Sequence, residues 1–298
     1  MEQPLVSVLI PVTGNRIYLE LALTSVLLQT YTNLEIIIRD PTPTDQIQIW
    51  IEKEFLPYSN KIRYIKECIY LSKVDILQKM IELSSGEYIN IMMEKDILYP
   101  TKIEQMMAHF LTDNKKGIQL VTSNVAYVDM HGNKKKNKNK MYHQDVYLDT
   151  IVIYNQLLKY SNYIGGISAP LFRKNGLVQE FGLFENQSFT TEIELASWLT
   201  LASQGSFVFL EEELTFERRK TEDISDKITL NRILDWVNLL ICLKQKNYLI
   251  TQGTEKYIIK KIIKWIDYLL DNKQNALTLQ ARDKLQAHKE YIYSLLVI

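Results

Sequence analysis

Cysteine is scarce in this sequence, and the few residues present do not form a recognisable site. The chain has 298 residues and two cysteines, Cys68 and Cys242, which lie far apart. Their separation lacks the close spacing of a metal centre, and two cysteines cannot build the framework of a disulfide-rich fold. We therefore expect two buried, reduced thiols in a cytoplasmic protein.

An excess of charge of either sign is also missing. Lysine plus arginine and aspartate plus glutamate both total 35, so the formal net charge is zero. A bulk attraction to nucleic acid or to acidic lipid is therefore excluded, and such a partner would need a local basic patch. We expect no nucleic-acid partner.

Long apolar runs and a secretory leader are absent too. No stretch approaches the roughly 18 apolar residues of a transmembrane helix, and residues 1–4 lack the basic and then apolar pattern of a signal peptide. These absences predict a soluble, cytoplasmic protein. The apolar residues 295–298 leave peripheral contact with the inner face of the membrane as an alternative.

Two phosphate-binding signatures do not occur. Only Gly14 follows the first apolar run, so there is no Gly-x-Gly-x-x-Gly turn, and a P-loop is missing as well. The sequence therefore gives no support to a dinucleotide-binding or P-loop enzyme.

What is present is an alternation of strand and helix patterns. The composition, 46% apolar and 23% charged, suits one large core with a smaller appendage. Short apolar runs predict strands at 5–10, 34–38, 62–65, 88–92 and 118–128, and helical spacing predicts helices at 15–29, 45–55, 73–83 and 101–111. This alternation predicts an α/β fold, with a mainly parallel sheet flanked by helices.

The ends of three predicted strands are expected to meet. Ligands of parallel sheets bind outside the carboxyl ends of the strands, which places residues 11–16, 39–45 and 93–96 around one crevice. Three segments that are far apart in sequence should therefore form a single site.

The pattern changes after residue 220. Amphipathic helices follow, and they must bury their apolar stripes against another surface. We predict one domain at 1–221 and a C-terminal helical region at 222–298. Packing on the first domain, a homodimer and docking on a partner transferase remain alternative uses of these helices.

Several linked motifs resemble one family. Residues 6–12, 25–38 and 85–89, followed by 169–174 and 181–185, are similar to the bacterial family 2 glycosyltransferases with the A-type nucleotide-sugar fold. The resemblance implies an inverting transferase that takes a nucleotide diphosphate sugar, with a UDP-sugar favoured, and a surface glycan or glycoprotein as acceptor. The alternative is a catalytically silent relative that binds a sugar nucleotide or a partner transferase.

The resemblance also implies a donor site. It assigns donor binding to the following residues: Pro11, Val12, Thr13, Arg16, Asp40, Lys73, Glu94, Lys95, Asp96, Arg218 and Lys220. In the family an aspartate at the position of Asp40 usually recognises the nucleotide base. The alternative, that Asp40 caps the turn at 41–44, stays open because aspartate favours turns.

The expected metal motif is degenerate. The family's Asp-x-Asp would fall on 93–95, where Met93 and Lys95 cannot serve as oxygen ligands, so only Glu94 and Asp96 remain for Mn²⁺ or Mg²⁺. A late Arg-x-His element is similarly replaced by Arg218, Arg219 and Lys220.

We hypothesise that Lys95 and Lys220 neutralise the diphosphate without a metal. The alternative is a decayed site in which both lysines are merely solvated.

The resemblance places the catalytic base at the start of a helix. Counting back from Trp198 selects Glu194, with Glu192 as the second choice. A glutamate in a first helical turn also interacts favourably with the helix dipole, so a structural role is an alternative. Gly165, Gly166 and Ile167 are expected to form the floor under the acceptor, or alternatively a plain turn.

Overall fold

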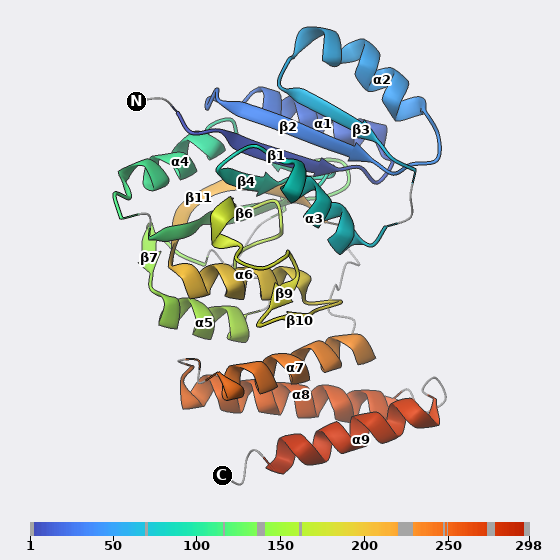
Figure 1. The fold of residues 1–298 in the computed structure, drawn as a ribbon, viewed down its shortest axis with the longest axis vertical. Coiled ribbons are helices and arrows are strands. Elements are labelled where there is room, and N and C mark those ends of the chain that lie inside the picture. Colours follow the sequence, from blue (N-terminus) through green and yellow to red (C-terminus); the bar gives the residue numbers. More distant parts are fainter. Residues whose placement is uncertain are drawn as a thin grey trace.

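The chain forms a mixed sheet covered by helices on both faces. The computed structural model describes residues 3–68, 71–115, 117–135, 141–160, 163–219, 229–246, 248, 250–272 and 278–294. Within these ranges the main sheet has nine strands, and Figure 1 shows it between two helical layers. The predicted α/β class is confirmed.

The N-terminal half of the sheet is parallel, as predicted. Its strands run in the order β3 (Ile62–Lys66), β2 (Leu34–Asp40), β1 (Val6–Pro11) and β4 (Tyr88–Ile91). All six residues of β1 are buried, which explains its continuous apolar run. Antiparallel pairing appears in the second half, which holds β8 (Leu171–Arg173), β6 (Ile118–Val128), β11 (Ser206–Arg218), β5 (Ile97–Leu98) and β7 (Val146–Leu148).

Two apolar cores lie on opposite faces of the sheet. One face packs against α1 (Arg16–Leu27), α2 (Gln46–Glu54) and α4 (Lys102–Thr112), and the other packs against α3 (Lys73–Leu83), α5 (Thr150–Lys159) and α6 (Ile193–Gln204). Side chains alternate across the sheet, so Val8 belongs to the first core and its neighbour Leu9 to the second. A short hairpin, β9 (Leu183–Phe184) with β10 (Gln187–Ser188), precedes α6.

The C-terminal helices extend the second core. Figure 1 shows α7 (Leu230–Gln245), α8 (Gln252–Asn272) and α9 (Leu279–Ser294) as a layer beyond α5 and α6, at the end of the molecule away from α2. Apolar side chains of all three helices join the cluster formed by α3, α5 and α6. The helices therefore pack within the chain, while the domain boundary, a homodimer and a partner transferase remain predictions.

One expectation about the thiols is wrong. Cys242 is buried, but Cys68 is exposed, because it follows the edge strand β3, where its thiol lies 3.3 Å from the Thr42 carbonyl. In the part of the chain that the structure describes, no helix has both the length and the apolar character needed to cross a bilayer.

Candidate active site

The loop after β1 is held by Glu94. The carboxylate of Glu94 accepts hydrogen bonds from the amides of Thr13 (2.7 Å), Asn15 (3.2 Å) and Gly14 (3.3 Å), and also from the Thr13 hydroxyl. These donors lie just before α1, where a negative charge is stabilised by unpaired amides and the helix dipole. The predicted meeting of residues 11–16 with 93–96 is therefore confirmed, and Glu94 shapes the loop.

Asp40 lies at the end of β2 and is completely buried. Its carboxylate accepts hydrogen bonds from the Thr42 amide (2.8 Å), the Tyr64 hydroxyl (2.5 Å) and the Lys66 ammonium (3.1 Å). Burial alone would raise the pKa of Asp40, but these three donors outweigh it and hold the pKa below its ordinary value. The geometry matches the turn-capping alternative, and recognition of the nucleotide base stays a prediction.

Three further residues of the predicted donor site lie in or next to the loop after β1. Pro11 and Val12 are buried at the end of β1, whereas Arg16 is exposed with its guanidinium 5.1 Å from the ring centre of Trp50. Arg16 and Trp50 line an open hollow between the loop and α2. Lys95 is exposed at the end of β4, and Lys220 lies outside the described residues.

Asp96 points into the protein. Its carboxylate accepts hydrogen bonds from the Ser168 hydroxyl (2.6 Å) and the Arg218 amide (3.2 Å), and the residue is 3% exposed. Arg218 is also buried, and its guanidinium donates to the carbonyls of Asp129 (2.9 Å) and Lys95 (3.3 Å). Asp96 and Arg218 therefore join β4 to β11.

Glu94 and Asp96 do not fit a divalent cation in this arrangement. Mn²⁺ and Mg²⁺ need several free oxygen ligands in open geometry, and the oxygens of both carboxylates already accept hydrogen bonds from the protein. Among the described residues, no group of three histidine, cysteine, aspartate or glutamate side chains is arranged to hold a metal.

A buried lysine lies beneath the same region. Lys102, at the start of α4, is fully buried and donates a hydrogen bond to the Ser168 carbonyl. Burial lowers the pKa of Lys102 to about 7, although the negative charges of Asp96 and Glu217 act to raise it. Burial likewise raises the pKa of Asp96 to about 6, although the hydrogen bond from Ser168 counteracts part of the effect.

We expect Lys102→Met to change how stability depends on pH. The unfolded chain binds a proton on Lys102 up to about pH 10, whereas the folded chain releases it near pH 7, so the lysine penalises folding less as the pH rises. The unfolding free energy of the wild type, relative to that of Lys102→Met, should therefore increase by about 1 kcal/mol per pH unit between about pH 7 and pH 9.

Urea titrations at several pH values measure this difference. Lys53→Met is the matched control, because the Lys53 side chain is 78% exposed and should show no such trend. A constant difference between the wild type and Lys102→Met would contradict a buried, easily deprotonated amine.

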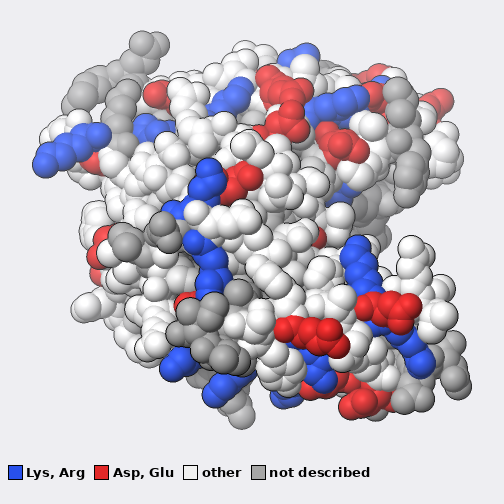
Figure 2. Space-filling model, turned by 60° about the horizontal axis from the view of Figure 1, so that its bottom comes forward, with Lys and Arg blue, Asp and Glu red and all other residues white. Residues whose placement is uncertain are grey.

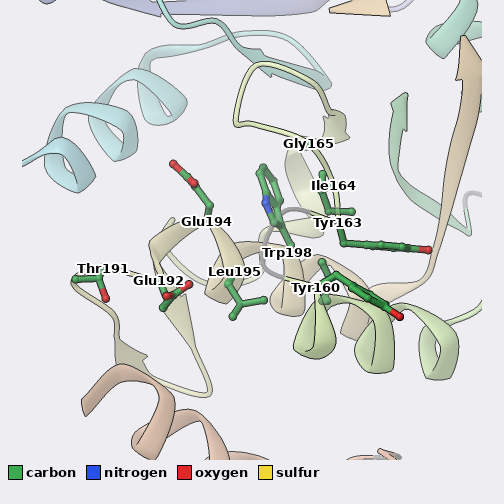
Figure 3. A pocket seen from close by; sticks show the side chains of 10 residues that line it. Tyr160, Tyr163, Ile164, Gly165, Thr191, Glu192, Glu194, Leu195 and Trp198 are labelled. Atoms are coloured by element: carbon green, nitrogen blue, oxygen red, sulfur yellow. The ribbon is translucent and has the colours of Figure 1, made fainter. Parts of the chain in front are cut away.

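Gly165 of the predicted acceptor floor lines the same pocket as Glu192 and Glu194, whereas Ile167 is buried. Figure 3 shows this pocket, which is lined by Leu157, Tyr160, Tyr163, Ile164, Gly165, Thr191, Glu192, Glu194, Leu195 and Trp198. Gly165 needs its left-handed φ of +86°, and the Gly166 amide donates to the buried carboxylate of Glu217. A side chain on Gly166 would lie 2.1 Å from that carboxylate, so these glycines allow close packing against the protein itself.

The two candidate bases face different partners. Glu194 pairs with Lys73, which begins α3, at 2.7 Å, and the two side chains are 38% and 50% exposed. Glu192 pairs with Arg232 of α7 at 2.6 Å, and both of these side chains are mostly buried. Figure 3 shows the two carboxylates pointing apart. Glu194 is the more accessible of the two and links an expected donor residue to the pocket.

Sequence reasoning missed the residues that support this site. Tyr64, Lys66, Lys102, Ser168, Glu217 and Asp235 all bind site residues or the segments that carry them. Only Asp235 has a signal in the sequence, since it is a carboxylate within the apolar pattern of residues 230–245. The partners of the others are distant in sequence.

Comparison with known proteins identifies the family of this chain. Residues 7–174 match the family model of glycosyl transferase family 2, which is more than half of the chain. The chain belongs to glycosyl transferase family 2. An uncharacterized glycosyltransferase of Haemophilus influenzae is 24% identical over 91% of this chain and 94% of its own length. One of Rickettsia felis is 37% identical over 35% of this chain, which corresponds to 17% of that protein.

Solved structures share the fold of this family 2 glycosyltransferase. S. aureus TarS 1–349 in complex with UDP-GlcNAc matches 96% of the chain and 79% of its own, with a TM-score of 0.63 and 12% identity. The mannosyltransferase PcManGT from Pyrobaculum calidifontis, in complex with GDP-Man and Mn²⁺, covers the same shares with a TM-score of 0.57 and 14% identity. At these identities the likeness shows the fold, and the predicted resemblance to family 2 is confirmed by the family model.

Proposed function

We propose that this glycosyltransferase moves a sugar, with inversion, from a nucleotide diphosphate sugar to a hydroxyl of a surface glycan or glycoprotein. A UDP-sugar is the favoured donor. The observation that carries the proposal is the ion pair, 2.7 Å long, between Lys73 and Glu194, which lines the pocket. It joins an expected donor residue to the expected base across 121 positions of sequence.

Glu194 acts as the base in this proposal. The acceptor oxygen attacks the anomeric carbon while the bond from that carbon to the diphosphate oxygen breaks on the opposite face. The proton of the acceptor hydroxyl passes to Glu194, and the nucleotide diphosphate leaves as an anion. Transfer of the sugar to the opposite face inverts the anomeric configuration.

Lysines take the place of a metal in the proposed site. Lys73 and Lys95 are both exposed enough to meet an entering diphosphate, and the carboxylates that could hold a cation already accept hydrogen bonds within the protein. Ammonium groups directed at the leaving group stabilise the charge that develops on it. Lys220 is the third cation of this proposal.

Chelation tests the proposal. Release of nucleotide from a panel of UDP- and GDP-sugars should continue in excess EDTA, and added Mn²⁺ should change the rate by less than about twofold. Lys95→Ala and Lys220→Ala should each lower kcat/KM by about tenfold, which corresponds to about 1.4 kcal/mol of lost stabilisation. Lys115→Ala, exposed just before the start of β6 and away from the strand ends that carry the candidate site, should leave the rate unchanged. Turnover that stops in EDTA and returns with Mn²⁺ would overturn the metal-free site.

The second candidate function is that of a catalytically silent relative, which binds a sugar nucleotide or a partner transferase without transferring a sugar. It is favoured by the carboxylates of Glu94, Asp96 and Asp40, whose oxygens already accept hydrogen bonds from the protein. Binding of UDP or GDP without turnover of any donor would support this candidate over the enzyme.

We further propose a cytoplasmic location with contact at the inner face of the membrane. The outer side of α8 presents a hollow lined by Tyr257, Lys260, Lys261, Lys264, Trp265 and Tyr268. Aromatic rings with polar edges and lysines together suit an anionic lipid surface. Figure 2 shows charges of both signs spread over this end of the molecule, so the attraction would be local.

Vesicle sedimentation tests this contact. The protein should bind phosphatidylglycerol vesicles at low salt and not phosphatidylcholine vesicles, because the attraction is electrostatic. Changing Lys260 and Lys264 to glutamate should lower binding about tenfold or more. The same charge reversal at Lys53 and Lys115, both exposed and distant from α8, is the control. Equal binding by the two double variants would contradict the contact.

A further inference from the structure

The three residues that precede α6 are held by a side chain from another helix, a contact that we call the cap on α6. Glu192, the residue before α6, makes no capping hydrogen bond with its own side chain. Instead, the Asp235 carboxylate of α7 accepts hydrogen bonds from the amides of Thr191 (2.7 Å), Thr190 (3.1 Å) and Glu192 (3.1 Å), and from the Thr191 hydroxyl (2.7 Å). Three successive amides therefore point at one carboxylate.

This arrangement fixes where α6 begins. Asp235 is 4% exposed, and a buried carboxylate is costly unless it is well hydrogen-bonded. The amides of residues 190–192 supply the hydrogen bonds that offset the cost of burying the Asp235 carboxylate, so any other path of this segment would leave that carboxylate without these partners. The negative charge also lies at the amino end of α6, where the helix dipole stabilises it.

A second residue of α7 holds the same segment. Arg232 lies three positions before Asp235, on the same side of the helix, and its guanidinium pairs with Glu192 at 2.6 Å. The guanidinium also lies 5.2 Å from the ring centre of Trp265 in α8. Two helices of the C-terminal region therefore restrain the residue before α6.

The preceding hairpin is tied to the same region. Glu185 lies in the turn between β9 and β10 with a left-handed φ of 52°, and it accepts a hydrogen bond from the Tyr248 hydroxyl and pairs with Lys246 at 3.5 Å. The ring of Tyr248 packs against Phe184, with 5.3 Å between ring centres. Both ends of the segment 184–192 are thus held by residues that follow α6 in sequence.

We infer that Asp235 is a positioning residue for the base, through which the C-terminal helices set the place of Glu194. Glu194 is the second residue of α6, so the direction of its side chain depends on where the helix starts. A displacement of about 1 Å at a reacting group can cost about 100-fold in rate. The inference rests on the proposed function, because it concerns the base of that reaction.

Asp235→Asn in the full chain tests the inference. The variant replaces one acceptor oxygen with an amide that faces the donors of residues 190–192, so their amide hydrogens should exchange about 10–100 times faster. We expect kcat for nucleotide release from the donor that turns over to fall about 10–100-fold, with the donor KM within about threefold. Asp267→Asn, which removes a carboxylate paired with Lys289 elsewhere in the helical region, should change neither quantity.

A milder variant covers the case in which Asp235→Asn does not fold. Thr191→Val removes only the hydroxyl that donates to Asp235, and it should show a smaller effect in the same direction, about 3–10-fold on kcat. Unchanged kcat and unchanged exchange in the folded variant would overturn the inference. Faster exchange with unchanged kcat would overturn it too, because the cap would then not position the base.

A double variant separates positioning from general damage. In a Glu194→Gln background, Asp235→Asn should lower the residual rate by less than about twofold, because its effect acts through the missing base. A further loss of tenfold or more would mean a structural role only and would overturn the inference. If Glu194→Gln alone keeps the full rate, the proposed base fails, whereas the exchange experiment still reports on the cap.

Discussion

Glu194→Gln is expected to lower kcat about 1000-fold while the donor KM stays within about threefold. A positioned base contributes about 100- to 10,000-fold to proton transfer, and glutamine keeps the shape of glutamate without accepting a proton. Because the amide oxygen of glutamine can still accept the hydrogen bond from Lys73, nucleotide binding should be nearly unaffected. Steady-state rates and calorimetric binding of UDP measure the two quantities separately.

Two further variants test whether the loss of activity is specific to Glu194. Glu212→Gln, on the exposed side of β11, is the matched control and should retain full activity. Glu192→Gln breaks the pair with Arg232 and should cost stability more than rate, since that side chain is 12% exposed and turned away from Glu194. A larger loss of kcat in Glu192→Gln than in Glu194→Gln would transfer the role of base to Glu192.

A chain that ends at residue 221 is expected to lose cooperative folding. The removed helices supply fully buried side chains such as Trp236, Ile258 and Ile262 to the core that also covers α5 and α6. Each large buried side chain contributes about 1.5–3 kcal/mol, and a whole domain is stable by only about 5–15 kcal/mol. Losing several such contacts exceeds that margin.

Thermal unfolding and binding of an apolar dye measure the outcome. The shortened chain should show no sharp transition and should bind the dye, because apolar surface of α5 and α6 becomes exposed. A chain that ends at residue 278 is the graded control. It lacks only α9, whose described buried side chains are Leu285 and Ile292, so it should unfold cooperatively at a lower temperature. A sharp transition of the 221-residue chain at the temperature of the full chain would instead support two independent domains.

Local patterns were sufficient to predict the fold class and most of the helices and strands up to residue 128, but not the antiparallel pairing in the second half of the sheet. The helix predicted at 73–83 occurs as Lys73–Leu83, since a capping box of Ser72 and Asp75 fixes its start. The strand predicted at 118–128 occurs as Ile118–Val128, because its side chains are almost all buried and its apolar run reflects that directly. The spacing of apolar residues and the capping of helices both depend on residues that are close in sequence, so both can be recognised before the fold is known.

The site was less predictable because its partners are distant in sequence. Glu94 lies against the loop after β1, but its contact with Thr13 spans 81 positions and could not be inferred from either segment alone, and its role in donor binding stays a prediction. The same is true of Lys66, which pairs with Asp40, and of Lys102, whose burial depends on the packing of α4. The gathering of Lys95 and Lys220 at the diphosphate stays a prediction.

The cap on α6 also sets an order of events during synthesis on the ribosome. Glu94 and Thr13, which are in contact at the loop after β1, are both translated early, whereas Asp235 follows Glu192 by 43 positions. At about 5–20 residues per second, α7 emerges several seconds after α6. A nascent chain can therefore form the contact between Glu94 and Thr13 well before residues 190–192 gain their partner on α7, and the positioning that we propose for Glu194 is complete only once translation has passed α7.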